Sequence, residues 1–398
     1  MKAKAITLVS VRITRRILTQ FAVLSARGRW AQSAARFLCP PRRSVPSTDM
    51  PDQTTPTPDV QTATDTQTSS TIPFVDLANL QGRIVMSGFF HDGCRWRTWT
   101  PIATGHLVEL KIVDLAEGFY FAEKPQSPTD AYFRFMEFIA QHASFPELKL
   151  AVVGMMDDIP NLSASLSKLQ LLHASRDRVG SGIPRMVATE VEYVLSVCRS
   201  LFDLLQEVIN KLWQMVTLTT PATTKRPMKG SFASVALFQE APATAEKLVE
   251  KYGLPQPLAD FYVAVTPFFL QLRTIRDNLI HHGSQVQTIF SDDSDFLISG
   301  HLRPFESMKI WRDHERQPNN LVPLRPAINA VVYRTLAVCE RFSEVMRQHF
   351  QLPPPLVPGM HLFMRGHFNA AFLEAMTDAM HRESSLVAEA SNGTARHQ

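Results

Sequence analysis

The sequence predicts a mainly α-helical protein, a helical bundle with a small β element and a disordered N-terminal segment. The bundle follows from long segments that carry apolar residues at helical spacing and from a composition, 45% hydrophobic and 20% charged, that suffices for a sizeable core. The β element follows from short apolar pieces between Gly and Pro residues. The disorder follows from one segment that is rich in Thr, Pro, Gln and Asp.

The N-terminal segment, residues 1–49, is distinguished by its charge. Ten Lys and Arg residues precede the first acidic residue, Asp49, and arginines break the apolar runs before any reaches the ~20 residues that span a bilayer. Such a segment is typical of a transit peptide, which would place the protein in an organelle. Alternatively, it is upstream sequence joined to a protein that starts at Met50, and we favour this interpretation. We exclude the segment from the fold.

Charge and cysteine usage limit the class of protein. Counted from Met50, the chain carries 31 Lys and Arg against 36 Asp and Glu, a net charge of −5, compared with +4 for all 398 residues. This balance excludes a global electrostatic footprint for nucleic acid, so any such binding is local. The cysteines form no CxxC pair, which argues against a disulfide framework and a structural zinc site. We therefore expect a cytoplasmic protein without a membrane span.

The remaining chain divides where its pattern changes. Residues 50–72 have almost nothing to bury and are expected to form a disordered linker. The further divisions are a small mixed lead-in with short strands at 73–125, a helical bundle at 126–350 with an extended insertion near 284–312, and a C-terminal tail with a short helix at 351–398.

Two apolar stripes give the main helices. From Val187 to Met215, nine apolar residues alternate at steps of four and three with no Gly or Pro between them, which predicts one long helix over 185–216 whose stripe is bundle core. A second stripe, from Phe261 to Leu279, predicts a helix that is kinked at Pro267 and ends at Gly283. A third long helix is predicted over about 326–350.

Other clusters have ordinary structural interpretations. The aromatic and basic cluster at 91–99 is typical of a turn with packed tryptophans, with base stacking or a phosphate contact as the alternative. The Gly180-Ser181-Gly182 segment lacks the ending of a phosphate loop. Several histidines are scattered singly and are interpreted as surface or core residues: His301, His314, His361, His367 and His381.

The last turns of the second long helix carry the candidate site. Its polar residues are Arg273, Arg276, Asp277, Asn278, His281 and His282. Asp277 and His281 are four residues apart and therefore share a helix face. An imidazole exchanges protons near neutral pH, and an arginine binds phosphate and stabilises charge in a transition state. Because an RNA 2′-hydroxyl can act as the internal nucleophile, these residue types suit RNA cleavage without a metal.

The segment resembles the signature of the HEPN superfamily, an Arg and a His separated by four to six residues with a polar residue after the Arg. Here it reads Arg276-Asp277-Asn278-Leu279-Ile280-His281, and His282 also falls within the spacing. The resemblance implies an all-α bundle, a homodimer in which two motifs meet in one cleft, and RNA cleavage without metal or cofactor. It implies that Arg276 binds the scissile phosphate, that His281 is the general acid and base, and that Asp277 positions His281. The remaining polar residues are assigned to substrate binding: Arg273, Asn278 and His282.

A second hypothesis stays open, in which the same residues are structural. A His at a helix C-terminus interacts favourably with the helix dipole and can cap the last carbonyls. Arg276 then forms a surface or interhelical ion pair, and the protein is a non-catalytic helical module that binds a protein or a nucleotide. The hypotheses differ in geometry, because in the nuclease Arg276 and His281 face an open cleft, whereas in the module nearby acids or carbonyls engage them.

Overall fold

The computed structural model describes residues 72–395 except 104–105, 220–224, 283–288 and 303–304. At 101–103, 106, 275–282 and 386–395 it describes the backbone alone. The predicted transit-like segment and almost all of the predicted linker lie outside the described residues, as does Gly283. Within the described part, no helix is long and apolar enough to cross a membrane.

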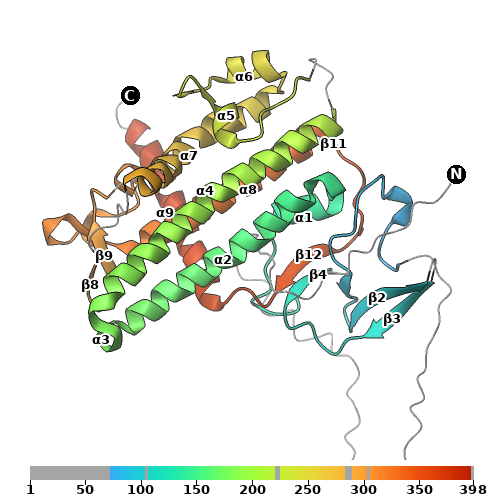
Figure 1. Ribbon diagram of the computed structural model, residues 1–398, viewed down its shortest axis with the longest axis horizontal. Coiled ribbons are helices and arrows are strands. Elements are labelled where there is room, and N and C mark those ends of the chain that lie inside the picture. The colour runs from blue at the N-terminus through green and yellow to red at the C-terminus, as the bar shows by residue number, and fades with distance from the viewer. Residues whose placement is uncertain (1–71, 104–105, 220–224, 283–288, 303–304, 396–398) are drawn as a thin grey trace, which may run out of the picture.

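A five-stranded mixed sheet forms one end of the molecule, with strand order β12-β4-β1-β2-β3 (Figure 1). The strands are β1 (Phe89–His91), β2 (Trp96–Ala103), β3 (His106–Lys111), β4 (Gly118–Ala122) and β12 (His361–Arg365). Adjacent strands are antiparallel except β1 and β4, which are parallel. The sheet has apolar residues on both faces, because Phe90, Trp99 and Phe121 join the main core while Trp96, Tyr120 and Phe363 form a second cluster.

The helices occupy most of the chain between the fourth and the last strand of this sheet. They are α1 (Arg134–His142), α2 (Lys149–Ala174), α3 (Arg176–Val179), α4 (Ile183–Met215), α5 (Phe232–Ala236), α6 (Ala245–Tyr252), α7 (Gln256–His282), α8 (Leu324–His349) and, after the last strand, α9 (Ala370–Ala395). Short strands pair between them: β5 (Thr217–Leu218) with β11 (Phe350–Gln351), β6 (Leu237–Phe238) with β7 (Ala241–Pro242), and β9 (Phe296–Ser299) with β8 (Phe290–Ser291) and β10 (Leu321–Pro323). Single-turn 3-10 helices lie at 77–79, 146–148, 180–182, 305–308, 313–315 and 318–320.

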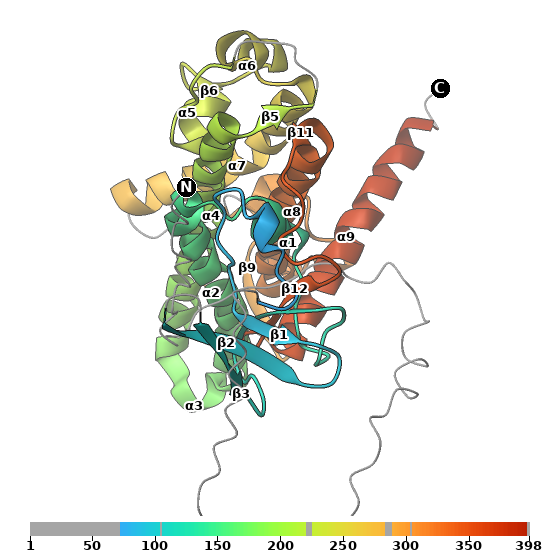
Figure 2. The same ribbon diagram turned by 90° about the vertical axis from the view of Figure 1, so that its right-hand side faces the viewer.

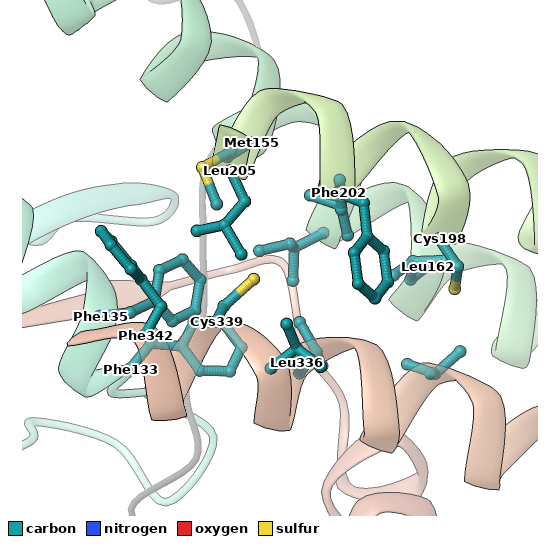
Figure 3. Packing of buried hydrophobic residues seen from close by; sticks show 14 of the residues in the cluster. Phe133, Phe135, Met155, Leu162, Cys198, Phe202, Leu205, Leu336, Cys339 and Phe342 are labelled. Carbon is teal, nitrogen blue, oxygen red and sulfur yellow. The ribbon is translucent and has the colours of Figure 1, made fainter. Parts of the chain in front are cut away.

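Helix α4 is the centre of the packing and lies against α2, α7 and α8. The predicted stripe is buried from Val187 to Leu212, whereas its last member, Met215, is 40% exposed. Figure 3 shows how Phe202 and Leu205 of α4 interleave with Leu336 and Phe342 of α8. The long helices thus bury one continuous apolar interior, which is what their four-three spacing predicts.

The predicted fold class is wrong in one respect: the chain is an α/β protein rather than a mainly α bundle with a small insertion. The five-stranded sheet and three smaller sheets exceed a minor β element. The strands were underestimated because they are short and because apolar residues on both faces hide the alternation that marks a half-buried strand. One strand, β12, pairs with β4 from more than two hundred residues away, which no local pattern indicates.

Individual elements agree better with the sequence. The helices predicted over 185–216 and about 326–350 correspond to α4 and α8, and Pro267 lies inside α7 without ending it. The stretch 308–311, predicted to be extended, instead follows a 3-10 helix at Phe305–Met308. The helix predicted in the C-terminal tail is not short, since α9 spans Ala370–Ala395.

Candidate functional site

The predicted site lies on the last turns of α7, a single helix that runs to His282. The earlier turns of α7 pack into the core, with Phe261, Val265, Phe269 and Leu272 buried. The remaining turns project from the side of the bundle (Figure 2). The side chains of Arg276, Asp277, Asn278, His281 and His282 lie outside the described residues, so the backbone alone fixes their order on the helix.

Arg273 is the one predicted site residue whose side chain is described. Its Nη1 atom lies 3.0 Å from Oε2 of Glu240, which belongs to the tight turn between β6 and β7. Gln239 and Glu240 both have positive φ, which is the conformation of a two-residue hairpin turn. Since Glu240 is largely exposed, the pair contributes little to stability. Arg273 is therefore engaged with this hairpin in the structure.

Helix α4 supplies the surface that faces α7. The two helices are antiparallel. Tyr262 of α7 donates to Gln206 of α4 at 2.6 Å, whereas Phe269, later in α7, contacts Phe202, earlier in α4, with the ring centroids 5.4 Å apart. Arg199 lies on this surface, 5% exposed, with its guanidinium 4.5 Å from the Phe269 ring centroid. The apolar spacing of α4 does not predict this buried cation, which follows Cys198 of the stripe and pairs with Asp203 at 2.8 Å.

A second group of polar residues lies where α1, β12 and the end of α8 meet. Nδ1 of His361, the first residue of β12, lies 2.6 Å from Oε1 of Glu137 in the first turn of α1. The Tyr132 hydroxyl donates to the other carboxylate oxygen. The Glu137 side chain is 9% exposed and that of His361 is 52% exposed. This hydrogen bond raises the pKa of His361 above its ordinary value.

The sequence does not reveal this group, in which His361 is a singly placed histidine. Glu137 lies 224 positions before His361, so no local motif joins the two residues. A weak signal existed, because Glu137 lies among the apolar residues Phe135, Met136, Phe138 and Ile139, where an acid is uncommon without a partner. An acid at such a position indicates that a partner exists but does not identify it.

A cavity of about 250 Å³ lies between α2, α8 and the turn before β9. Asp295 lines it, and burial raises the pKa of its carboxyl group. The carboxylate accepts hydrogen bonds from the backbone N–H of Phe296 at 2.8 Å and of Arg325 at 3.2 Å. Because Arg325 is in the first turn of α8, Asp295 caps that helix, and this structural role accounts for its burial.

In the part of the chain that the structure describes, no group of three or more His, Cys, Asp and Glu residues is placed to hold a metal ion. Comparison with protein-family models, with curated proteins and with solved structures finds no match. The resemblance to the HEPN superfamily therefore depends on residues 276–281 alone.

Proposed function

We propose that the protein is a HEPN-like, metal-independent endoribonuclease that acts through the end of α7. The observation that carries the proposal is the placement of the whole Arg276–His281 signature on the last turns of one helix. On that helix Asp277 lies one turn before His281, as a residue that positions an imidazole must. Arg276 binds the scissile phosphate, and His281 transfers the proton of the 2′-hydroxyl or of the leaving oxygen.

The placement of α7 supports the proposal. Helix α7 packs against α4 and α8 of this α/β protein, and its last turns project from the other helices (Figure 2). This projection favours contact of the helix end with a single-stranded RNA or with a second copy of the chain. We infer that the protein works as a homodimer in which two such helix ends form one cleft.

The proposal is tested by incubating end-labelled RNA with the full chain in EDTA, beside Arg276→Ala and His281→Ala. We expect each substitution to lower the cleavage rate at least about 100-fold, the usual size of a lost acid–base or charge-stabilising group. Arg185→Ala on α4 and His381→Ala on α9 are matched controls, because both residues are exposed on long helices. Equal cleavage by all five proteins, or none by the parent, contradicts the proposal.

A non-catalytic interaction module is the second candidate. Two acids near α7 favour it: Glu240 already pairs with Arg273, and Oε1 of Glu192 on α4 is buried with no hydrogen-bond partner in the described chain. Continued from the Tyr262–Gln206 and Phe269–Phe202 pairs, the antiparallel arrangement of α4 and α7 places position 276 level with residues 192–195 of α4, a range that includes Glu192. If the protein is such a module, we expect Glu192 and Arg276 to form a structural ion pair. The losses of unfolding free energy in Glu192→Gln and Arg276→Ala should then not add up in the double variant. Additive effects contradict that pairing.

A further inference from the structure

A second site is built far from the end of α7, around the Glu137–His361 pair. A cavity of about 200 Å³ lies between α1, the end of α8 and the loop that precedes β12. Figure 2 shows α1, α8 and β12 side by side at this point. Gln141 holds the loop in place, because its Nε2 donates to the carbonyls of Val357 at 3.0 Å and Met360 at 2.8 Å, and its Oε1 accepts from the Val357 N–H at 2.8 Å. The cavity is therefore a formed part of the fold.

The first ligand group of the cavity is the outer nitrogen of His361. Because Nδ1 faces a carboxylate at 2.6 Å, Nδ1 carries a hydrogen and Nε2 is the atom left for a ligand. Both oxygens of Glu137 are already engaged, one by His361 and one by Tyr132. Glu137 is thus a positioning residue that holds His361 in one orientation and favours its protonated form.

The second ligand group is the guanidinium of Arg347, in the last turn of α8. Its Nη2 atom lies 3.9 Å from Oε2 of Glu137 and donates weakly to the carbonyl of Arg134 at 3.5 Å. The Arg347 side chain is 40% exposed, and its guanidinium lies 5.8 Å from the Phe138 ring centroid. A guanidinium has five N–H donors, so several remain for an anion in the cavity.

His142 supplies a hydrogen-bond acceptor on the same cavity wall. Its Nδ1 lies 2.8 Å from the carbonyl oxygen of Pro353, which can only accept, so Nδ1 carries the hydrogen. Burial lowers the pKa of His142, which keeps the ring neutral and leaves Nε2 as an acceptor. The cavity thus combines two cationic donors with one neutral acceptor.

The charges around the cavity favour a ligand with negative charge. On α8, burial raises the pKa of Glu340 to about 8, which keeps that carboxyl mostly neutral near pH 7. Arg134 is paired with Glu344 at 2.8 Å, so the two charges compensate each other. What remains is the negative charge of Glu137, the positive charge of Arg347, and His361, whose protonated form is favoured because its hydrogen bond to Glu137 raises its pKa.

We propose that this cavity binds a phosphate group, with His361 and Arg347 donating to its oxygens and His142 accepting from a phosphate hydroxyl. A phosphate offers both acceptor oxygens and, when protonated, an O–H donor, whereas a carboxylate offers acceptors alone. The cavity is smaller than the roughly 300–1,000 Å³ of typical ligand pockets. The ligand is therefore inorganic phosphate itself or the phosphate end of a small phosphate monoester.

Calorimetric titration of the full chain with inorganic phosphate, glycerol 2-phosphate and acetate tests the proposal. We expect saturable binding of phosphate, weaker or no binding of acetate, and an affinity for phosphate lowered at least about tenfold in His361→Ala and in Arg347→Ala. Tighter binding of glycerol 2-phosphate than of phosphate identifies a monoester as the ligand class, and the reverse identifies free phosphate. Binding of acetate as tight as that of phosphate, or no saturable binding of phosphate, overturns the proposal.

Two controls separate this site from structural effects and from the end of α7. His301→Ala removes a similar pair on the open surface, where His301 Nδ1 lies 3.1 Å from Glu306, and it should leave phosphate affinity unchanged. Glu137→Gln should move the pH dependence of phosphate binding to lower pH, because His361 loses the charge that favours its protonation. His361→Ala should leave RNA cleavage unchanged, so either proposal can fail without the other. Equal phosphate affinity in the parent and all variants overturns the phosphate site.

Discussion

At the scale of single residues, two carboxyl groups near Tyr132 show how burial and partners decide charge. Glu137 has both oxygens engaged, by Tyr132 and His361. Glu340 has one oxygen that accepts from the Arg134 N–H at 3.0 Å, while its Oε2 is buried without a partner in the described chain. Burial therefore raises the pKa of Glu340 to about 8, because a charged carboxylate is poorly solvated there.

Glu340→Gln tests this directly. For a carboxyl whose folded pKa, about 8, exceeds the ordinary glutamate pKa of 4.5, the stability that the protonated form contributes is present below about pH 4.5 and is lost as the pH rises to about 8. In that window the free energy of unfolding of the parent should fall relative to the variant by up to about 1.4 kcal/mol per pH unit. Urea unfolding at several pH values measures the free energy of unfolding of both proteins. A difference between them that does not change with pH would contradict the raised pKa of Glu340.

At the scale of elements, the sequence predicts helices well because the apolar residues that mark a helix all lie within one continuous segment. The stripes of α4 and α8 define most of both helices, since residues three and four apart meet the same neighbours. The sheet depends on pairing between distant segments. Strand β12 is five residues long and pairs with β4 along its whole length, but neither strand shows alternation that would reveal its partner.

The two candidate sites differ in how far the sequence could predict them. The candidate site at the end of α7 could be predicted from sequence because Arg276, Asp277 and His281 are neighbours along one helix. The Glu137–His361 pair was not found, because its members come from a helix and a strand that only the folded sheet brings together. A site assembled by tertiary pairing leaves no spacing to recognise.

The turn after β12 gives a test at this scale. Gly366 has φ of +94°, and a Cβ built there lies 2.6 Å from the backbone oxygen of Ala116. Gly366→Ala should therefore destabilise the protein by about 2 kcal/mol or more, through both the strained φ and the backbone overlap. Gly182→Ala is the control, since that glycine has helical φ and no atom within 4 Å of the added Cβ. Thermal unfolding compares them, and equal melting temperatures would refute the role of Gly366.

At the scale of the whole molecule, the last elements of the chain complete both the sheet and the helical core. Strand β12 is the last strand of the five-stranded sheet, and α9 packs against α8. Leu362 and Met364 of β12 and Phe372 and Met376 of α9 are all buried. Each such side chain contributes about 1.5–3 kcal/mol on burial, and together they approach the whole stability of a typical domain.

A chain that ends at Gln351 should therefore lose its cooperative unfolding transition. A chain that ends at Ser385 is the control, because it keeps the buried residues of β12 and the buried residues described in α9. Circular dichroism during heating distinguishes the two, with a transition close to that of the parent expected for the longer chain alone. A cooperative transition in the shorter chain would mean that the sheet and bundle do not need these elements.

The most direct test of RNA cleavage at the end of α7 compares two substrates in EDTA with the parent protein. One is an all-ribose oligonucleotide, and the other has the same sequence with deoxyribose throughout. If His281 activates the 2′-hydroxyl, the first substrate is cleaved to products that end in a 2′,3′-cyclic phosphate, and the second remains intact. Cleavage of both substrates, or of neither, would contradict the proposed reaction.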